Sequence, residues 1–277
     1  MKRAIACVAV AAAAGATTFV AVTPAQAAPA DPVAALKSRF AAGKGVKFTD
    51  VTTLLAFEGN TSFLKRTGSF QFGKAGIVAS DTSARRTVAE ADMPINMIWR
   101  LTKPERTIRI GTTSYYSGGP WAPSKGKTWI KHPNGMNAGF TGWYGQLVNV
   151  AEPATLKALI AKGKRTGLTY SGAISFGALE KISPWMRNVS LSRLSGNDKT
   201  AVLRFTLTLG ADRLPRRLVT VYPGSTHVSA AVGEDRRLSV ETRYTGWGSR
   251  VTVKAPPAGK VENMGNREPT VRGGGRG

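Results

Sequence analysis

The sequence contains almost no cysteine: among its 277 residues there is a single one, Cys7. Cys7 lies in a segment with the features of a secretory signal peptide, in which Lys2-Arg3 precedes an apolar, alanine-rich stretch over residues 4–22. Ala25-Gln26-Ala27 then provides a small-x-small cleavage pattern, so we expect residues 1–27 to be removed on export. The mature chain would contain no cysteine, which excludes disulfide bonds, thiolate catalysis and cysteine-ligated metals.

Two other fates of this N-terminal segment are less favoured. A retained membrane anchor would need a more hydrophobic segment than this alanine-rich one. A lipoprotein signal places its cysteine after the apolar stretch, whereas Cys7 comes only four residues beyond Arg3. We therefore expect an extracytoplasmic protein, either secreted or associated with the cell envelope, that carries no lipid on Cys7.

Acidic residues are scarce, with 16 Asp and Glu against 39 Lys and Arg and a net charge of +23. Removal of Lys2 and Arg3 would leave 37 basic against 16 acidic residues, a net charge near +21. Such an excess favours anionic partners: teichoic-type polymers, anionic lipid head groups, phospholipid surfaces or nucleic acid. The basic residues form only short clusters, at residues 85–86, 162–165, 213–217 and 236–237. A solubilising charge spread over the whole surface is therefore the alternative interpretation.

Recognisable catalytic motifs are also missing. The sequence has two histidines, His132 and His227, each close to turn residues, and it contains neither H-E-x-x-H nor G-x-S-x-G. Glu234-Asp235 could be a pair of catalytic carboxylates, but its position before Arg236-Arg237 is better explained as a charged hairpin turn. A Ser-His-Asp set stays open because serine is abundant. We expect a protein that is not an enzyme and has no cofactor and no metal site.

Strand patterns are the strongest signal that is present, and residues 237–257 show it best. Val240, Thr242 and Tyr244 alternate with polar residues, which predicts a β-strand with one buried face. The glycines around Trp247 predict a bulge or sharp bend that changes the buried face, and Pro256-Pro257 would end the strand. A strand that bends in this way is typical of a strongly curved sheet.

Similar patterns recur along most of the chain. Leu203, Phe205 and Leu207 alternate with polar residues, and Ile108 and Ile110 alternate with arginines, as in a sheet with one face in water. Further strands are predicted within residues 45–86 (two or three strands), 94–101, 107–110, 127–130, 167–182, 200–214, 215–224, 236–248 and 249–257.

Two short helices complete the prediction. The first covers about three turns from Asp31, which precedes a proline at the first helical position, towards Gly43. The second begins at Glu152-Pro153 and stops at Gly163. We expect one domain over residues 28–260 and a disordered tail over residues 261–277.

The segment from residue 111 to residue 145 is dense in glycine, proline and aromatic residues. Its aromatics could line the mouth of a pocket for an acyl chain or a sugar ring. Interleaved with lysines, they could instead stack on single-stranded bases, but the order of strands does not suit an OB-type barrel, so no nucleic acid is expected. Ordinary packing beneath long loops is the third interpretation.

The order of elements resembles the exported actinobacterial lipoproteins of the LppX and LprG type, within the LolA-like lipoprotein-carrier superfamily. The opening helix and Gly-Val-x-Phe strand at residues 31–48 carry the resemblance, together with the stretches at residues 111–116 and 126–130. The closing pattern Tyr-x-x-Trp-Gly-x-x-Val-x-Val-x-x-Pro-Pro at residues 244–257 is the last part. The chain departs from the family because it lacks a lipobox cysteine.

The resemblance implies a mainly β (α+β) fold, in which a curved antiparallel half-barrel sheet of about ten or eleven strands is covered by a few short helices. It also implies an apolar cavity that binds or carries an acylated, anionic envelope lipid, lipoglycan or lipoprotein. We expect a monomer that meets an anionic membrane or cell-wall surface. The alternative is an envelope sensor or interaction module that regulates an anti-sigma factor or binds an anionic cell-wall polymer.

The residues expected to bind the ligand are apolar or aromatic positions of the predicted strands. Tyr115 and Trp129 are expected near the mouth of the cavity. The full set is Phe70, Phe72, Ile108, Ile110, Tyr115, Trp129, Leu203, Phe205, Leu207 and Tyr244.

Overall fold

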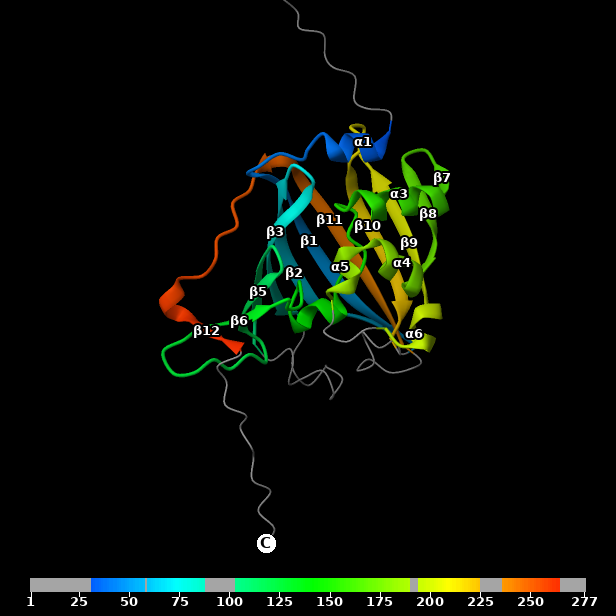
Figure 1. Ribbon diagram of the computed structural model, residues 1–277. Helices are drawn as coiled ribbons and strands as arrows, with labels where there is room; N and C mark the ends of the chain where they lie inside the picture. Colours follow the sequence, from blue (N-terminus) through cyan, green and yellow to red (C-terminus); the bar gives the residue numbers. More distant parts are fainter. Residues whose placement is uncertain (1–30, 58, 88–102, 190–193, 225–235, 265–277) are drawn as a thin grey trace, which may run out of the picture.

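Twelve strands form a single open, curved sheet in the part of the chain that the structure describes, and short helices lie against its concave face (Figure 1). The structure is a computed structural model that describes residues 31–57, 59–87, 103–189, 194–224 and 236–264. The expected signal peptide, the expected strand at residues 94–101, His227 and the pair Glu234-Asp235 lie outside these residues. The mainly β fold expected from the sequence is confirmed.

The strand order across the sheet is β12-β6-β5-β4-β3-β2-β1-β11-β10-β9-β8-β7. Neighbouring strands pair antiparallel, except that β12 pairs parallel with β6. The strands are β1 (Lys44–Ala56), β2 (Gly59–Gly73), β3 (Gly76–Arg86), β4 (Glu105–Ile110), β5 (Thr113–Gly118), β6 (Trp129–Pro133), β7 (Lys164–Thr166), β8 (Thr169–Ser175), β9 (Val202–Leu209), β10 (Pro215–Pro223), β11 (Arg237–Arg250) and β12 (Val261–Asn263).

The two faces of the sheet follow from the register of the strands. Residues directly opposite each other in a ladder share a face, and residues two apart along a strand share it as well. Phe48 is opposite Tyr244 and Gly68, and Phe70 is opposite Ser80, which in turn is opposite Arg109. This set defines the inner, concave face on which the helices pack.

The bend predicted around Trp247 is present as a bulge in the middle of the sheet. Three residues of β11, Gly246 to Gly248, lie between the pairs Lys47–Thr245 and Gly45–Ser249, where β1 has only Val46. Gly246 and Gly248 both have positive φ, of 67° and 77°. The strand pairing ends at Arg250, so the further strand expected over residues 249–257 is wrong. Residues 251–257 instead run along the side of the sheet towards β12 (Figure 1).

Five α-helices are described; a side chain caps the start of four of them, whereas α3 begins at a proline without a side-chain cap. The expected helix at residue 152 is confirmed, whereas the first helix is shorter than expected because it ends at Lys37. Residues 167–182 were predicted as one strand, but the strand β8 ends at Ser175. Ser175 instead caps the helix α4 by accepting from the backbone N–H of Ala178. The helices are α1 (Pro32–Lys37), α3 (Pro153–Lys162), α4 (Phe176–Ile182), α5 (Pro184–Arg187) and α6 (Gly196–Thr200).

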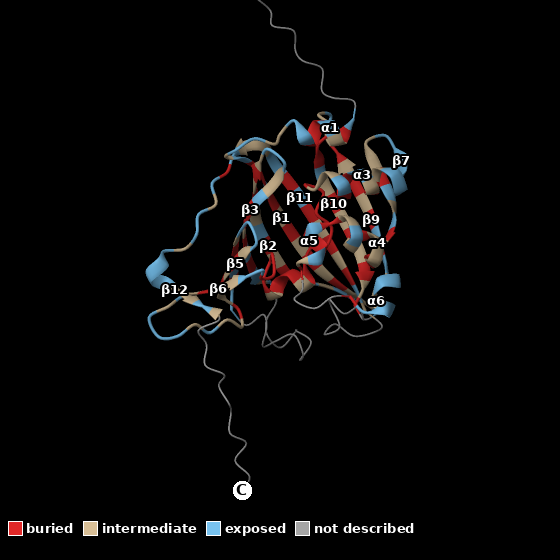
Figure 2. Cartoon of the chain, viewed as in Figure 1, coloured by how far each residue is buried: buried red, intermediate tan, exposed pale blue. Residues whose placement is uncertain are grey.

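An irregular segment fills the space between the sheet and these helices. The 3₁₀ helix η2 (Phe140–Tyr144) leads into residues 145–151, which are buried throughout (Figure 2). Hydrogen bonds tie this segment to the inner face: Thr52 Oγ1 donates to the Tyr144 carbonyl at 2.7 Å, and Tyr222 Oη donates to the Gly145 carbonyl at 3.0 Å. Most of the concave face is therefore occupied by the protein itself.

The last strand lies just beyond the boundary that we placed after Lys260. A 3₁₀ turn, η4 (Ala258–Lys260), leads into β12, which adds to the edge strand β6. Lys127 Nζ donates to the Gly259 carbonyl at 3.0 Å, and Glu262 accepts from the backbone N–H of Ser124 at 2.6 Å. Residues 265–277 of the expected tail lie outside the described residues.

Candidate functional site

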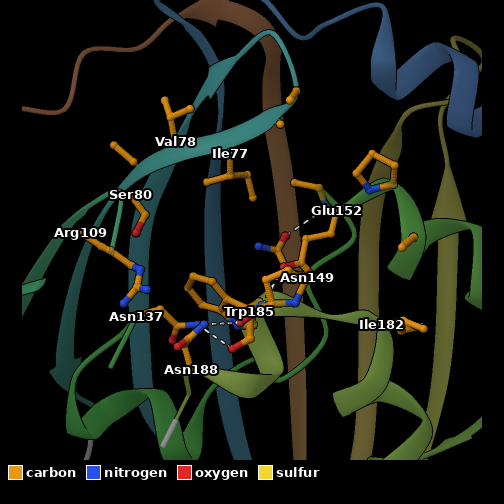
Figure 3. Close-up of a pocket in the computed structure, with 18 residues that line it drawn as sticks. Ile77, Val78, Ser80, Arg109, Asn137, Asn149, Glu152, Ile182, Trp185 and Asn188 are labelled. Carbon is orange, nitrogen blue, oxygen red and sulfur yellow. Dashed lines mark hydrogen bonds between the residues drawn. The ribbon is translucent and has the colours of Figure 1, made fainter. Parts of the chain in front are cut away.

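A cleft of about 450 Å³ opens on the inner face beside the tip of the β2–β3 hairpin (Figure 3). One wall comes from Ile77 to Ser80 of β3 together with Arg109 of β4. The other comes from the N-terminus of α3 and from α5, which contributes Trp185. The cleft lies beside residues 144–151, the segment that covers most of the inner face, and Asn149 and Ala151 of this segment line it.

Two buried asparagines in the cleft carry side-chain atoms with no hydrogen-bond partner. Asn137 donates through Nδ2 to the Trp185 carbonyl at 2.6 Å, which leaves its Oδ1 unpaired. Asn149 accepts through Oδ1 from the Ala151 N–H at 3.0 Å, which leaves its Nδ2 unpaired. Each asparagine is only 2% exposed. Because buried polar groups are nearly always paired, one free acceptor and one free donor indicate a site for a polar ligand or water.

Arg109 adds a positive charge to the same cleft. Its Nη1 donates to Ser114 Oγ at 3.2 Å and to the Gly135 carbonyl. Partial burial lowers the pKa of Arg109, but the guanidinium stays charged because its pKa is normally far above neutrality. Within the described residues no carboxylate forms an ion pair with Arg109. An anionic ligand group is therefore the missing partner with the best chemical fit.

Glu152 also lines the cleft, but its carboxylate is already used. It accepts from Ser183 Oγ at 2.5 Å, from the Trp185 backbone N–H at 2.7 Å and from Thr155 Oγ1 at 2.9 Å. Burial raises the pKa of Glu152 above its ordinary value, although these hydrogen bonds lower it in part. Glu152 thus joins the start of α3 to the start of α5 and fixes the wall of the cleft.

Apolar side chains line much of the rest of the cleft. Ile77 and Val78 lie on the β3 side, and Ile182, the last residue of α4, lies on the other (Figure 3). Pro184, the first residue of α5, also lines the cleft. The ring of Trp185 is held by a hydrogen bond from Nε1 to the Gln146 carbonyl at 2.9 Å. Val78 is 45% exposed although it is a large apolar residue. The cleft therefore combines an apolar wall with a polar base.

Six of the ten residues predicted to bind a ligand do lie on the inner face, where they form the packed core. Phe70 meets Trp185 edge-to-face at 5.3 Å between ring centroids, and Phe72 stacks on Trp247 at 6.1 Å. The void next to Phe70 and Tyr244 measures only about 10 Å³, enough for about one water. The six are Phe70, Phe72, Leu203, Phe205, Leu207 and Tyr244, all less than 4% exposed. In the part of the chain that the structure describes, α3, α4, α5 and residues 144–151 cover these six side chains.

The other four predicted residues are on the opposite face of the sheet. Ile108 is opposite Asp81 and Tyr115, and Tyr115 is opposite Lys131, all on the outer face. Ile110 and Trp129 have the same parity, so they face outward too. The prediction that Tyr115 and Trp129 lie at the mouth of an inner cavity is wrong. In β4 isoleucine alternates with arginine, and the prediction placed the isoleucines on the inner face. The structure instead places Arg109 on the inner face.

The residues that line the cleft were not among those predicted from the sequence to bind a ligand. Arg109 was assigned to the wet face, and Glu152 was noted only as the start of a helix. Asn149 had a usable signal, since it interrupts the apolar run 147–151, where a polar residue in a buried segment has a specific partner or role. Asn137 and Trp185 stood in segments without clear periodicity.

The described residues contain no obvious catalytic or metal-binding set. No group of three or more His, Cys, Asp or Glu residues is placed to hold a metal in the described part of the chain. The Nδ1 atom of His132 pairs with the Pro133 carbonyl at 2.7 Å, and its ring contacts Tyr116. Across the described ranges, no helix is both long and apolar enough to cross a membrane.

Comparison with known proteins gives only remote similarity. No family model and no curated protein sequence matches the chain. Among solved structures, a LolA superfamily protein from Nitrosomonas europaea matches with 8% identity and a TM-score of 0.28, over 82% of this chain and 93% of that one. A DUF1329 family protein from Desulfovibrio piger matches with 8% identity and a TM-score of 0.31, over 78% and 89% of the two chains. These scores are too low to place the chain in either family.

Proposed function

We propose that this protein is a non-catalytic, extracytoplasmic binding protein for an acylated, anionic amphiphile of the cell envelope. The acyl chain would lie against Ile77, Val78 and Ile182, and the head group would meet Arg109, Asn137 and Asn149. The observation that carries the proposal is the pairing of an apolar wall with unpaired polar atoms in one cleft.

The polar base supports an anionic head group with a hydrogen-bonding oxygen. Arg109 can donate to an anionic oxygen through its Nε and Nη2 atoms, which have no protein partner among the described residues. Asn149 Nδ2 offers a further donor, and Asn137 Oδ1 offers an acceptor for a hydroxyl group. A purely apolar ligand would leave all of these groups unpaired at a cost of roughly 1–3 kcal/mol each.

The size of the cleft supports one acyl chain rather than several. About 450 Å³ is at the lower end of the volumes typical of small-molecule sites. Each methylene moved from water to the apolar wall contributes about 0.8 kcal/mol, so a single chain can provide useful affinity. Core side chains and the covering segment occupy most of the inner face, which makes a carrier of large multi-chain lipids a poorer fit.

The proposal is tested by titrating the mature protein, from Ala28 onward, with a fluorescent fatty acid. Arg109→Gln should weaken binding by about tenfold, the order expected for the loss of one charge-assisted hydrogen bond of roughly 1.5 kcal/mol. Arg106→Gln is the matched control, since it removes the same charge from the same strand but from the outer face. Absence of fatty-acid binding to the wild type, or equal losses in both variants, would contradict the proposal.

A second candidate function is an interaction module that recognises a protein partner, and the filled inner face favours it. Phe176 and Leu179 of α4 and Leu156 and Leu159 of α3 are fully buried. A core packed to this extent resembles a scaffold more than a container. Chemical crosslinking in the producing cells should then capture a discrete envelope partner, and the purified protein should bind no amphiphile.

A further inference from the structure

We propose that the outer face of the sheet carries a second binding site, a groove for a linear phosphodiester polymer of polyol or sugar units. The groove consists of two adjoining hollows of about 470 and 420 Å³. Both hollows are lined by Thr67, Ser83 and Arg106, so they form one continuous depression. This site lies on the opposite side of the sheet from the cleft of the proposed function and is independent of it.

The strand register arranges the lining of the groove in rows that cross the sheet. In one row Thr49, Thr67, Ser83, Arg106 and Ser117 stand opposite one another on β1 to β5. The neighbouring row contains Thr245, Lys47, Ser69 and Asp81 on β11, β1, β2 and β3. Five spacings between strands at about 4.8 Å give the groove a length of roughly 24 Å, which suits an extended chain better than a single phosphate.

Four cations border the groove, together with one partly exposed carboxylate, that of Asp81, and one buried carboxylate, that of Glu105. Lys47, Arg85 and Arg106 are exposed and Lys65 is partly exposed. Asp81 is neutralised by Arg106, whose Nε and Nη2 atoms bond to the two carboxylate oxygens at 3.0 and 2.7 Å. Glu105 also borders one hollow, but its carboxylate accepts on the inner side from Trp121, Phe140 and Thr141. The groove is therefore positively charged, with three cations available to phosphates.

Hydroxyl groups without a protein partner are the second feature of the groove that favours this ligand. Six Ser and Thr side chains line it, and within the described residues none of them makes a side-chain hydrogen bond to protein; they are Thr49, Thr67, Ser69, Ser83, Ser117 and Thr245. Each hydroxyl can both donate and accept, so the row can serve phosphate oxygens and ligand hydroxyls alike. A polymer that alternates phosphates with polyol units presents both groups repeatedly.

Two other classes of polyanion fit the groove less well. A membrane surface would engage apolar anchors, but the exposed large apolar residues Phe57, Val78, Ile110 and Val202 do not line either hollow. Single-stranded nucleic acid binds through stacking on aromatic rings. Neither hollow is lined by an exposed aromatic side chain, and the nearby Trp129 ring is covered by the Arg106 guanidinium at 5.7 Å.

The test measures binding of the mature protein to a synthetic poly(glycerol phosphate) of defined length. The triple variant Lys47→Gln, Lys65→Gln, Arg85→Gln should lose at least about tenfold in affinity, and the slope of log affinity against log salt should fall by roughly two to three, as for three lost phosphate contacts. The control Lys157→Gln, Lys162→Gln, Lys164→Gln removes the same charge from exposed positions around α3 and β7. It should bind within about twofold of the wild type.

Several outcomes would overturn this proposal. Equal losses in the two triple variants would mean binding through net charge alone. Tighter binding to a deoxythymidine oligonucleotide with the same number of phosphates would assign the groove to nucleic acid, and tighter binding to phosphatidylglycerol vesicles would assign it to a membrane. Fatty-acid binding in the cleft should be unchanged in the groove variant, so a failure of either proposal is recognised separately.

Discussion

Arg66 and Asp50 form an ion pair in the centre of the inner face, where each side chain is only 1% exposed. Arg66 Nη2 lies 2.7 Å from Asp50 Oδ2, and Arg66 Nε donates to both carboxylate oxygens. Burial would lower the pKa of Arg66, but the Asp50 carboxylate more than compensates, and the pKa is raised. Gly145 lies directly over the guanidinium, where an added Cβ would overlap the Cζ atom of Arg66. The pair therefore lies directly beneath the segment that fills the concave face.

Breaking this pair should therefore be costly. Asp50→Asn leaves the Arg66 charge buried without a counter-ion, and we expect the free energy of unfolding to fall by about 3–5 kcal/mol. Urea denaturation followed by tryptophan fluorescence measures the change. The double variant Asp50→Leu, Arg66→Met removes both charges and should recover most of the loss. A loss below about 1 kcal/mol in the single variant would show that water reaches Arg66.

Glu105 predicts a pH dependence of stability. Its carboxylate is 2% exposed, and burial raises its pKa above the ordinary value of 4.5, although hydrogen bonds from Thr141 and Trp121 lower it in part. The folded state then binds this proton more tightly than the unfolded state. The resulting stabilisation is complete below pH 4.5 and is lost as the pH rises through the folded pKa.

The variant Glu105→Gln cannot ionise, so it should lack this part of the pH profile. We expect the wild type to lose stability relative to the variant as the pH rises above the ordinary carboxyl pKa of 4.5 and through the raised pKa of the folded state. Urea unfolding at several pH values measures the difference. A wild type that gains stability relative to the variant over that range would show that the pKa of Glu105 is lowered instead.

At the scale of elements, the bulge in β11 depends on glycine. Gly248 has φ of 77°, and an added Cβ there would also approach Arg39 at 3.3 Å. Trp247, held between the two glycines, donates through Nε1 to the Pro215 carbonyl at 2.7 Å and stacks on Phe72. The bulge thus places an aromatic ring over the core near the end of strand β11.

Gly248→Ala should destabilise the protein by about 1–2 kcal/mol, because an L-residue is strained at positive φ. Gly259→Ala is the matched control, since Gly259 is not among the positive-φ glycines and an added Cβ meets nothing within 4 Å. Thermal unfolding of the two variants gives the comparison. Equal melting temperatures would mean that the bulge relaxes without strain.

Period-two patterns predict where the strands lie, but they do not always predict which face of a strand is buried. In β9 the large residues Leu203, Phe205 and Leu207 are apolar and their neighbours are polar, so the inner face is clear. In β4 the same pattern pairs isoleucine with arginine, and the arginine faces inward because the inner side is the polar cleft there. Periodicity separates two faces and does not say which one meets the core.

The short helices show a similar limit. Ser175 and Ser183-Pro184 are ordinary helix-start signals, but α4 and α5 have only seven and four residues, too few for a helical period to emerge. Both helices exist because they cover the sheet, a tertiary cause that no local pattern contains. The second helix, α3, was predicted correctly because its ten residues begin at a proline, carry an apolar stripe and are followed by Gly163.

At the scale of the whole molecule, the sheet separates two surfaces with different chemistry. The inner face is largely packed, and its candidate cleft has an apolar wall and unpaired amides at its base. The outer face is cationic and rich in hydroxyls, and part of the net charge of +23 gathers in its groove. Composition alone predicted anionic partners, but it could not separate a charged groove from a uniformly basic surface, because that distinction requires the strand register.

The candidate cleft was the least predictable feature. It combines residues from β3, β4, α5 and the segment around Asn149, which lie far apart in the sequence. The apolar residues that were predicted to bind a ligand instead fill the core, since an apolar inner face is required for folding whether or not a cavity remains. The cleft differs from the core by its open volume and by the unpaired amides of Asn137 and Asn149, and both features appear only once the packing is known.

Native mass spectrometry of the mature protein, followed by organic extraction of any adduct, tests amphiphile binding most directly. We expect a discrete adduct that extracts as a single-chain, anionic, acylated molecule, and we expect Arg109→Gln to lose it while Arg106→Gln retains it. A bare protein mass that stays unchanged after incubation with fatty acids and anionic lysolipids would contradict the account.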